Sequence, residues 1–372
     1  MEKLNLNKLN IEQLSLEEKI AQMLIISLKE NEITKETINM IQKYKIGGII
    51  LYRKDYKSYA EMLKTINKLK EISRINKIPL LISIDQEGGR VNRMPPEIKN
   101  FRSASKIAET GNLELIDNYA QITARMLKSI GIDMNYAPVL DIKRFEDEHA
   151  IGNRCFGKDE IEVSKYGIEF MKETINNGVI PVIKHFPGHG ATTKNSHISL
   201  PVINRKIEEL EKKDIYPFKK AIENGAEAIM VGHLVIRAID NKPASLSKMV
   251  IQEYLKNKYK FNGLIMTDDI NMWAIKLRYS PTKAVELAIK SGNDMIMGTL
   301  EYNKIQKVIK NIAKKVERGK IEISQINNSV EKIINFKEKY NVNDNEVKGF
   351  NIQEINEKIE QVNKKVEDNE KI

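Results

Sequence analysis

The sequence predicts a single (β/α)8 barrel, and three observations lead to that fold. The chain contains eight short apolar runs of strand length, most of them separated by amphipathic segments with helical spacing, and five of the runs end in polar or ionisable residues. Strands that alternate with helices are typical of parallel strands joined by crossover helices. Eight such units in about 300 residues favour a closed barrel, in which functional side chains follow the carboxyl ends of the strands.

The predicted strands occur in regular order along the chain. They are Met23–Leu28, Gly48–Tyr52, Leu80–Asp85, Met134–Asp141, Val179–His185, Ala228–His233, Leu264–Asp268 and Asp294–Gly298. Predicted helices between them include Tyr59–Ile72, Leu115–Ile130, Ile161–Asn176, Lys206–Asn224, Lys248–Tyr259 and Thr282–Ser291. The alternative is an open doubly wound sheet, which is disfavoured because no glycine-rich phosphate-binding fingerprint follows the first strand.

The character of the chain changes after about residue 340, so we expect a barrel domain over residues 1–340 and a charged helical tail over residues 341–372. The tail holds eight acidic and five basic residues, and its apolar residues Ile352, Ile355, Ile359 and Val362 have helical spacing. This pattern favours a solvated or partly docked helix. A coiled-coil partner surface is the alternative, but the repeat is short.

The composition excludes several classes of protein. The net charge of +10 comes from lysines spread along the chain, with no arginine-rich stripe, which disfavours binding to nucleic acid. The sequence has no run of about 20 apolar residues, so we expect no membrane span. The single cysteine, Cys155, fits a reducing compartment. The polar stretch Met1–Leu14 lacks the apolar core of a secretory signal, so we expect a cytoplasmic protein, with export left open.

The ends of the predicted strands supply the candidate functional residues. Asp85, Asp141, Lys184-His185, His233 and Asp268-Asp269 each end an apolar run. A carboxylate such as Asp85 can accept hydrogen bonds from neighbouring hydroxyl groups, and the arginines that follow it add rigid pairs of donors. Adjacent carboxylates on a strand point to opposite sides, so only one of Asp268 and Asp269 is expected to face a cleft.

The histidines also permit a metal site, built from His185, His189, His197 and His233. No His-x-His pair closes the first strand, and no His-Glu-x-x-His pattern occurs. The sequence therefore favours a site without metal or other cofactor.

Five segments together resemble a known family. Asp85–Arg93, Gly152–Phe156, Lys184–Gly190, Asn195-Ser196-His197 and Thr267–Met272, in this order and spacing, resemble glycoside hydrolase family 3, and most closely its β-N-acetylglucosaminidase branch. The resemblance covers about residues 12 to 340, and the segment Lys-His-Phe-Pro-Gly-His-Gly is highly specific. The tail falls outside it.

The resemblance implies a (β/α)8 barrel and a retaining enzyme that removes terminal β-linked N-acetylglucosamine, often from muropeptides. It implies that Asp268 is the nucleophile and His197 the acid/base, and that Asp85, Arg93, Arg154, Lys184 and His185 bind the sugar. These roles suit the chemistry, because retaining cleavage needs a carboxylate to trap the anomeric carbon and a proton donor for the leaving oxygen. An imidazole that titrates near neutral pH can act as that donor.

The sequence departs from the family at Asn195, where the branch usually has an aspartate that orients and charges the histidine. An amide can orient an imidazole but cannot stabilise the imidazolium, and the analogous change in a hydrolytic triad lowers the rate roughly 10⁴-fold. Three interpretations of Asn195 are open: the enzyme is slower, another carboxylate compensates, or the acceptor or substrate is different. Alternatively, Asn195 is only a turn residue and His197 works alone.

Two alternative functions remain at this point. A non-catalytic sugar-binding protein on a hydrolase barrel is supported only by Asn195, and the presence of Asp268 and His197 counts against it. A β-glucosidase or a phosphorylase is the nearest alternative enzyme, although those branches typically take a carboxylate acid/base from a second domain. The sequence does not fix the oligomeric state or the natural leaving group.

Overall fold

A computed structural model describes residues 11–29, 32–144, 151–191 and 200–370. Its core is a sheet of eight parallel strands, β1 (Leu24–Ser27), β2 (Gly48–Leu51), β3 (Leu81–Ile84), β4 (Met134–Asn135), β5 (Ile180–Phe186), β7 (Ala228–Val231), β9 (Leu264–Thr267) and β10 (Ile296–Met297). Seven of the strands lie within the predicted apolar runs, and β5 extends one residue beyond its run, to Phe186. The order in the sheet is β10-β1-β2-β3-β4-β5-β7-β9. The predicted (β/α)8 barrel is therefore confirmed.

The barrel closes between its first-listed and last-listed strands, β10 and β9. A parallel bridge joins Met266 to Met295, and the Thr267 amide donates to the Met295 carbonyl at 3.2 Å. The Met297 amide also donates to the Thr267 hydroxyl, at 3.2 Å. All four residues of β1, β2, β3, β7 and β9 are buried, as expected for strands covered on both faces.

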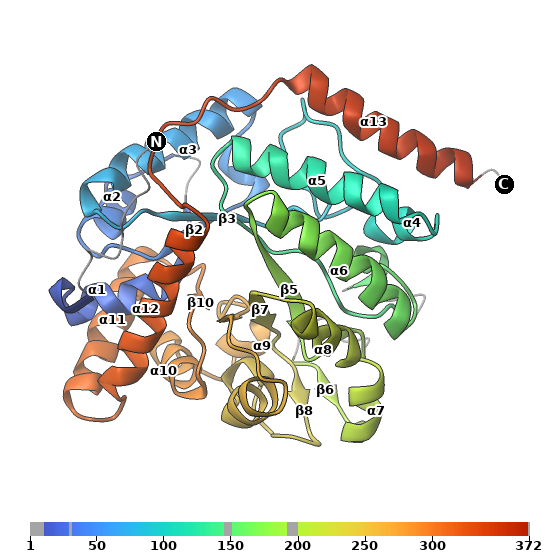
Figure 1. The fold of residues 1–372 in the computed structure, drawn as a ribbon. Helices are drawn as coiled ribbons and strands as arrows, with labels where there is room; N and C mark the ends of the chain where they lie inside the picture. Colours follow the sequence, from blue (N-terminus) through green and yellow to red (C-terminus); the bar gives the residue numbers. More distant parts are fainter. Residues whose placement is uncertain (1–10, 30–31, 145–150, 192–199, 371–372) are drawn as a thin grey trace.

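Helices cover the outside of the barrel (Figure 1). Their bounds are α1 (Leu16–Gln22), α2 (Lys35–Gln42), α3 (Tyr59–Ser73), α4 (Ala104–Ala108), α5 (Leu113–Ser129), α6 (Glu160–Asn176), α7 (Ile207–Lys212), α8 (Tyr216–Glu223), α9 (Trp273–Lys276), α10 (Pro281–Ser291), α11 (Tyr302–Glu317), α12 (Ile323–Lys339) and α13 (Ile352–Asn369). Short polar side chains cap several of them, and Asp159, for example, accepts the backbone amides of Ile161 and Glu162 at the start of α6.

Two predicted helices differ in detail from the structure. The segment Lys206–Asn224 is divided into α7 and α8, because Pro217 lies in the first turn of α8, where its missing amide hydrogen is tolerated. The segment Lys248–Tyr259 is helical over Met249–Lys258, but with the wider hydrogen bonding of a π-helix. A separate parallel pair, β6 (Val202–Ile203) and β8 (Val235–Ile236), lies outside the barrel sheet.

The C-terminal helix α13 lies alongside α5, as Figure 1 shows. Ile355, Ile359, Val362 and Val366 form its buried face, and the amide of Asn363 donates to the Asn100 carbonyl at 2.9 Å. Within the described residues, no helix is long and apolar enough to cross a membrane.

Candidate active site

The site is a cavity of about 380 Å³ at the carboxyl ends of the barrel strands. Its size is in the range of small-molecule pockets. The lining residues come from the strands β5, β7 and β10, from the segments that follow β2, β3, β5 and β9, and from the segment around Arg154. They are Tyr52, Asp85, Glu87, Val91, Arg93, Ile151, Arg154, Lys184, His185, His189, Met230, Asp268, Asp269, Asn271, Met272, Trp273 and Met297.

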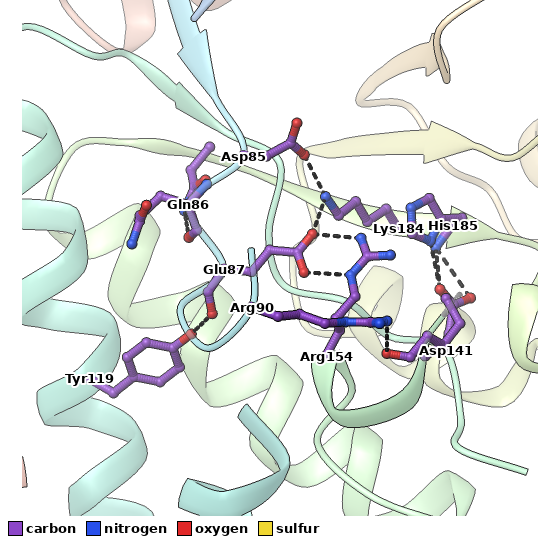
Figure 2. Close-up of polar contacts among 11 residues, drawn as sticks. Asp85, Gln86, Glu87, Arg90, Tyr119, Asp141, Arg154, Lys184 and His185 are labelled. Carbon is purple, nitrogen blue, oxygen red and sulfur yellow. Dashed lines mark hydrogen bonds and ion pairs between the residues drawn. The ribbon is translucent and has the colours of Figure 1, made fainter. Parts of the chain in front are cut away.

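A chain of four charged groups forms one wall of the cavity (Figure 2). Lys184 Nζ lies 2.7 Å from Asp85 Oδ1 and 2.6 Å from Glu87 Oε1. Arg154 binds Glu87 in two places, with Nε 2.7 Å from Oε2 and Nη2 2.7 Å from Oε1. Such a bidentate pair fixes both the position and the plane of the guanidinium group.

Glu87 is the centre of this chain and its most buried carboxylate, with a side chain only 3% exposed. Burial alone would favour its neutral form, but the cations of Arg154 and Lys184 hold the pKa of the Glu87 carboxyl well below its usual range. Glu87 is therefore ionised at neutral pH, and its charge partly balances the two buried cations that contact it.

The loop that carries Asp85 and Glu87 turns back on itself through two glycines. Gly88 and Gly89 both have positive φ, at 75° and 54°, which side chains other than hydrogen rarely allow. A Cβ at Gly89 would lie 2.9 Å from the Ser103 Cα. The Tyr119 hydroxyl donates to the Glu87 carbonyl, so the loop is tied to α5 beneath it.

His185 is oriented by a buried aspartate on the neighbouring strand loop. Its Nδ1 lies 2.6 Å from Asp141 Oδ2, and the backbone amide of His189 donates to Asp141 Oδ1 at 2.6 Å. Burial would raise the pKa of Asp141, but His185 and the amide donors hold it below its usual value. An ionised Asp141 accepts a hydrogen bond from Nδ1–H, so Nε2 is the remaining polar atom of the His185 ring. Burial lowers the pKa of His189 to about 4, which keeps that ring neutral.

Asp268 and Asp269 both border the cavity, unlike the alternation expected from a strand. β9 ends at Thr267, and the chain turns immediately after it. The carboxylate of Asp269 is held by the amides of Asn271 at 2.9 Å and Thr299 at 3.0 Å and by the Thr299 hydroxyl. Burial raises the pKa of Asp269. Asp269 therefore braces the turn, while Asp268 is half-buried at the cavity wall.

The remaining histidine candidates are resolved differently. His233 has its Nδ1 2.7 Å from the Ser245 hydroxyl and its Nε2 2.9 Å from the Asp269 carbonyl, and burial lowers its pKa. No three His, Cys, Asp or Glu side chains converge as metal ligands anywhere in the described ranges. His197 and Asn195 lie outside the described residues.

The structure brings six of the eight predicted site residues to one cavity, namely Asp85, Arg93, Arg154, Lys184, His185 and Asp268. Sequence reasoning missed Glu87 and did not assign Asp141 to His185. Glu87 lies two residues after Asp85, but nothing in the sequence pairs it with Arg154, 67 residues away.

The carboxyl ends of the barrel strands bring carboxylates, two arginines, a lysine and two histidines to a cavity of small-molecule size. This arrangement is typical of an enzyme that acts on a small molecule. Comparison with known proteins narrows this class. Residues 15–336 match the Glycosyl hydrolase family 3 N terminal domain. The chain belongs to glycoside hydrolase family 3 and is a glycosidase.

Two curated relatives share one enzyme name, and a solved structure of the family superposes on the chain. The chain is 30% identical over 298 residues to a beta-hexosaminidase of Methylobacillus flagellatus, covering 78% of this chain and 83% of the relative. It is 35% identical over 259 residues to a beta-hexosaminidase of Hydrogenovibrio crunogenus, covering 68% and 71%. A solved β-N-acetylglucosaminidase of the family, from Paenibacillus sp. FPU-7, superposes with a TM-score of 0.87 at 30% identity, covering 94% of this chain and 68% of that one.

Proposed function

We propose that the protein releases terminal β-linked N-acetylglucosamine with retention of configuration, and that fragments of peptidoglycan are its natural substrate. The observation that carries the proposal is the placement of Asp268 in the same cavity as the chain Asp85–Lys184–Glu87–Arg154. The choice of N-acetylglucosamine as the substrate sugar is supported by the relatives named beta-hexosaminidase. The cell-wall source is an expectation from the resemblance of the sequence to the muropeptide-cleaving branch.

The charged wall suits a sugar ring with several hydroxyl groups. Asp85 accepts hydrogen bonds, and Lys184 has three N–H donors, two of which point to Asp85 and Glu87. The third can donate to a hydroxyl of the bound sugar. Because Glu87 neutralises part of the local positive charge, the site can bind an uncharged sugar without attracting anions indiscriminately.

Asp268 is the proposed nucleophile. Its carboxylate attacks the anomeric carbon, the bond to the leaving oxygen breaks, and His197 donates the proton to that oxygen. Water then attacks the glycosyl-enzyme ester, giving its proton to His197 and releasing Asp268 and a β-configured sugar. A histidine base has the advantage that no second negative charge approaches Asp268 in either step.

Hydrolysis of p-nitrophenyl N-acetyl-β-glucosaminide tests the function. We expect wild-type protein to release p-nitrophenol, and Asp268→Asn to lower kcat by at least about 10³-fold, because the amide is a far weaker nucleophile. Asp159→Asn is a matched control, since asparagine caps a helix as well as aspartate does. A 5-fluoro-N-acetylglucosaminyl donor should label the peptide that contains Asp268. Binding of N-acetylglucosamine without any turnover would identify a sugar-binding protein instead.

Asn195 offers a second test of the same mechanism. If His197 is the acid/base and lacks only a carboxylate to stabilise its imidazolium form, Asn195→Asp should raise kcat by about tenfold or more, because the new carboxylate supplies that stabilisation. The measurement is the pH profile of kcat for both proteins. An unchanged or lower rate would show that the asparagine belongs to a different proton-transfer arrangement.

A further inference from the structure

Trp273 is the only tryptophan of the chain, and its side chain is 49% exposed. A single exposed apolar side chain is common on a protein surface, but an indole ring offers a large face on which a ligand can pack. Trp273 also lines the cavity that contains Asp268. The exposed ring therefore belongs to the mouth of the proposed active site and not to an unrelated surface.

The ring is held at a fixed position relative to Asp268. Asp269, next to Asp268, binds the amide of Asn271, and the Asn271 side chain donates to the Thr299 carbonyl at 3.3 Å. Helix α9 then begins at Trp273 itself. The ammonium group of Lys276, one turn later, lies 4.3 Å from the centre of the indole ring, a cation–π contact that orients it.

Exposure increases across the cavity from the charged wall to Trp273. The side chain of Lys184 is 2% exposed and that of Asp85 is 19% exposed, whereas Trp273 is half in solvent. Tyr52, the other aromatic residue among the described lining residues, is partly buried beneath the guanidinium of Arg93. If a sugar binds the charged wall, its leaving group can extend toward the exposed Trp273, which lines the same cavity.

We propose that Trp273 is the stacking platform for the leaving group, and that it gives the enzyme a preference for a pyranose ring at that position. The C–H face of a pyranose is apolar and slightly positive, so it packs on the negative face of an indole ring. This inference rests on the proposed function, because a leaving group exists only if the bond to the bound sugar is cleaved.

The test compares substrates with and without a ring in the leaving group. An N,N′-diacetylchitobiose substrate places a pyranose over Trp273, whereas N-acetyl-β-glucosaminyl fluoride has only fluoride to expel. An aryl glycoside would be unsuitable, because its aromatic ring can also stack. We expect Trp273→Ala to lower the ratio of kcat/KM for chitobiose to kcat/KM for the fluoride by about tenfold, and Trp273→Phe to restore much of it.

Leu277→Ala is the matched control. Leu277 follows α9, is 62% exposed and is not among the residues that line the cavity, so its loss removes exposed apolar surface without removing the platform. Its substrate ratio should equal that of the wild type. An unchanged ratio in Trp273→Ala, or an equal fall in Leu277→Ala, would overturn the proposal.

Failure of the two proposals can be told apart. If wild-type protein does not hydrolyse the fluoride, the proposed function is wrong; if it hydrolyses the fluoride and the ratio does not change, only the role of Trp273 is wrong. A second disaccharide, N-acetylglucosaminyl-1,6-anhydro-N-acetylmuramic acid, separates the two sources of a pyranose leaving group. Both disaccharides should lose rate in Trp273→Ala, and the one with the larger wild-type kcat/KM identifies the source as chitin-like or peptidoglycan-like.

Discussion

The charged wall of the candidate active site and the C-terminal helix α13 both contain ion pairs, but the pairs differ in burial. In the wall, Lys184, Glu87 and Arg154 have side chains 2%, 3% and 16% exposed. Four exposed pairs join α13 to other segments, and every side chain in them is at least 44% exposed: Lys99–Glu360, Arg102–Glu367, Lys106–Glu370 and Glu114–Lys365. Buried pairs are costly to break, whereas exposed pairs contribute little.

The difference in burial between the two sets of ion pairs separates the sources of stability from the requirements of the binding site. The helix is fixed mainly by its buried face, which includes Ile359 and Val366, and by amide hydrogen bonds of Asn363. Its ion pairs add solubility and small increments of stability. The wall gains little from the same chemistry in net folding energy, because desolvation opposes the attraction. What the wall gains is a fixed arrangement of donors, which a binding site needs.

The two regions are also connected through one loop. Asn363 of α13 binds the backbone of Asn100 and of Arg102, and the Asn100 side chain donates to the Gly89 carbonyl at 2.6 Å. Gly89 belongs to the turn that carries Asp85 and Glu87. The tail that lies beyond the family match at residue 336 thus supports the loop that shapes the cavity.

Removing the charge of Glu87 should have the largest effect in this comparison. Glu87→Gln removes the carboxylate that contacts both Arg154 and Lys184, although Lys184 keeps its contact with Asp85, so we expect the free energy of unfolding to fall by about 3–5 kcal/mol. Displacement of the two donors should also lower kcat/KM by about 100-fold. Urea unfolding and the p-nitrophenyl substrate measure the two effects. The control is Glu114→Gln, the same change in an exposed pair, which should alter stability by less than about 0.5 kcal/mol. Equal effects at both positions would remove the distinction between the two regions.

The contribution of Glu87 to the free energy of unfolding should decrease progressively as the pH is lowered. The pKa of Glu87 is lower in the folded state than its unfolded value of about 4.3, so the unfolded state binds more protons and stability rises with pH in that window. The stabilising contribution is complete above about pH 5 and is lost as the pH falls toward the folded pKa. The difference in unfolding free energy between wild type and Glu87→Gln should therefore narrow below about pH 4. A constant difference would mean that Glu87 is not the group that titrates.

Breaking an exposed pair should have the smallest effect. A double-mutant cycle on Arg102→Ala and Glu367→Ala should give a coupling energy of about 0.2–1 kcal/mol, because both side chains are nearly half exposed. The coupling should disappear near 1 M NaCl, where the screening length is about 3 Å. A coupling energy above about 2 kcal/mol that persists in high salt would show that the ion pairs of α13 behave like the buried pairs of the charged wall.

The sequence predicted the barrel well because a buried parallel strand leaves a local signal. Each of the eight apolar runs coincides with a strand, with β5 extending one residue beyond its run, since strands covered on both faces must be apolar along their length. The division between α7 and α8 was missed, although Pro217 is a local mark of a helix start, because the flanking residues keep helical spacing across the break.

For the site, the sequence alone determined which residues are unusual: charged and polar side chains such as Asp85, Lys184 and Asp268 that follow apolar strands. Only the tertiary structure decided which of them work together. The pairing of Glu87 with Arg154 and of Asp141 with His185 joins residues 67 and 44 positions apart. The physical reason is that a strand covered on both faces must be apolar, and its own residues show this. An ion pair instead depends on which other strand end the closed barrel brings within 3 Å.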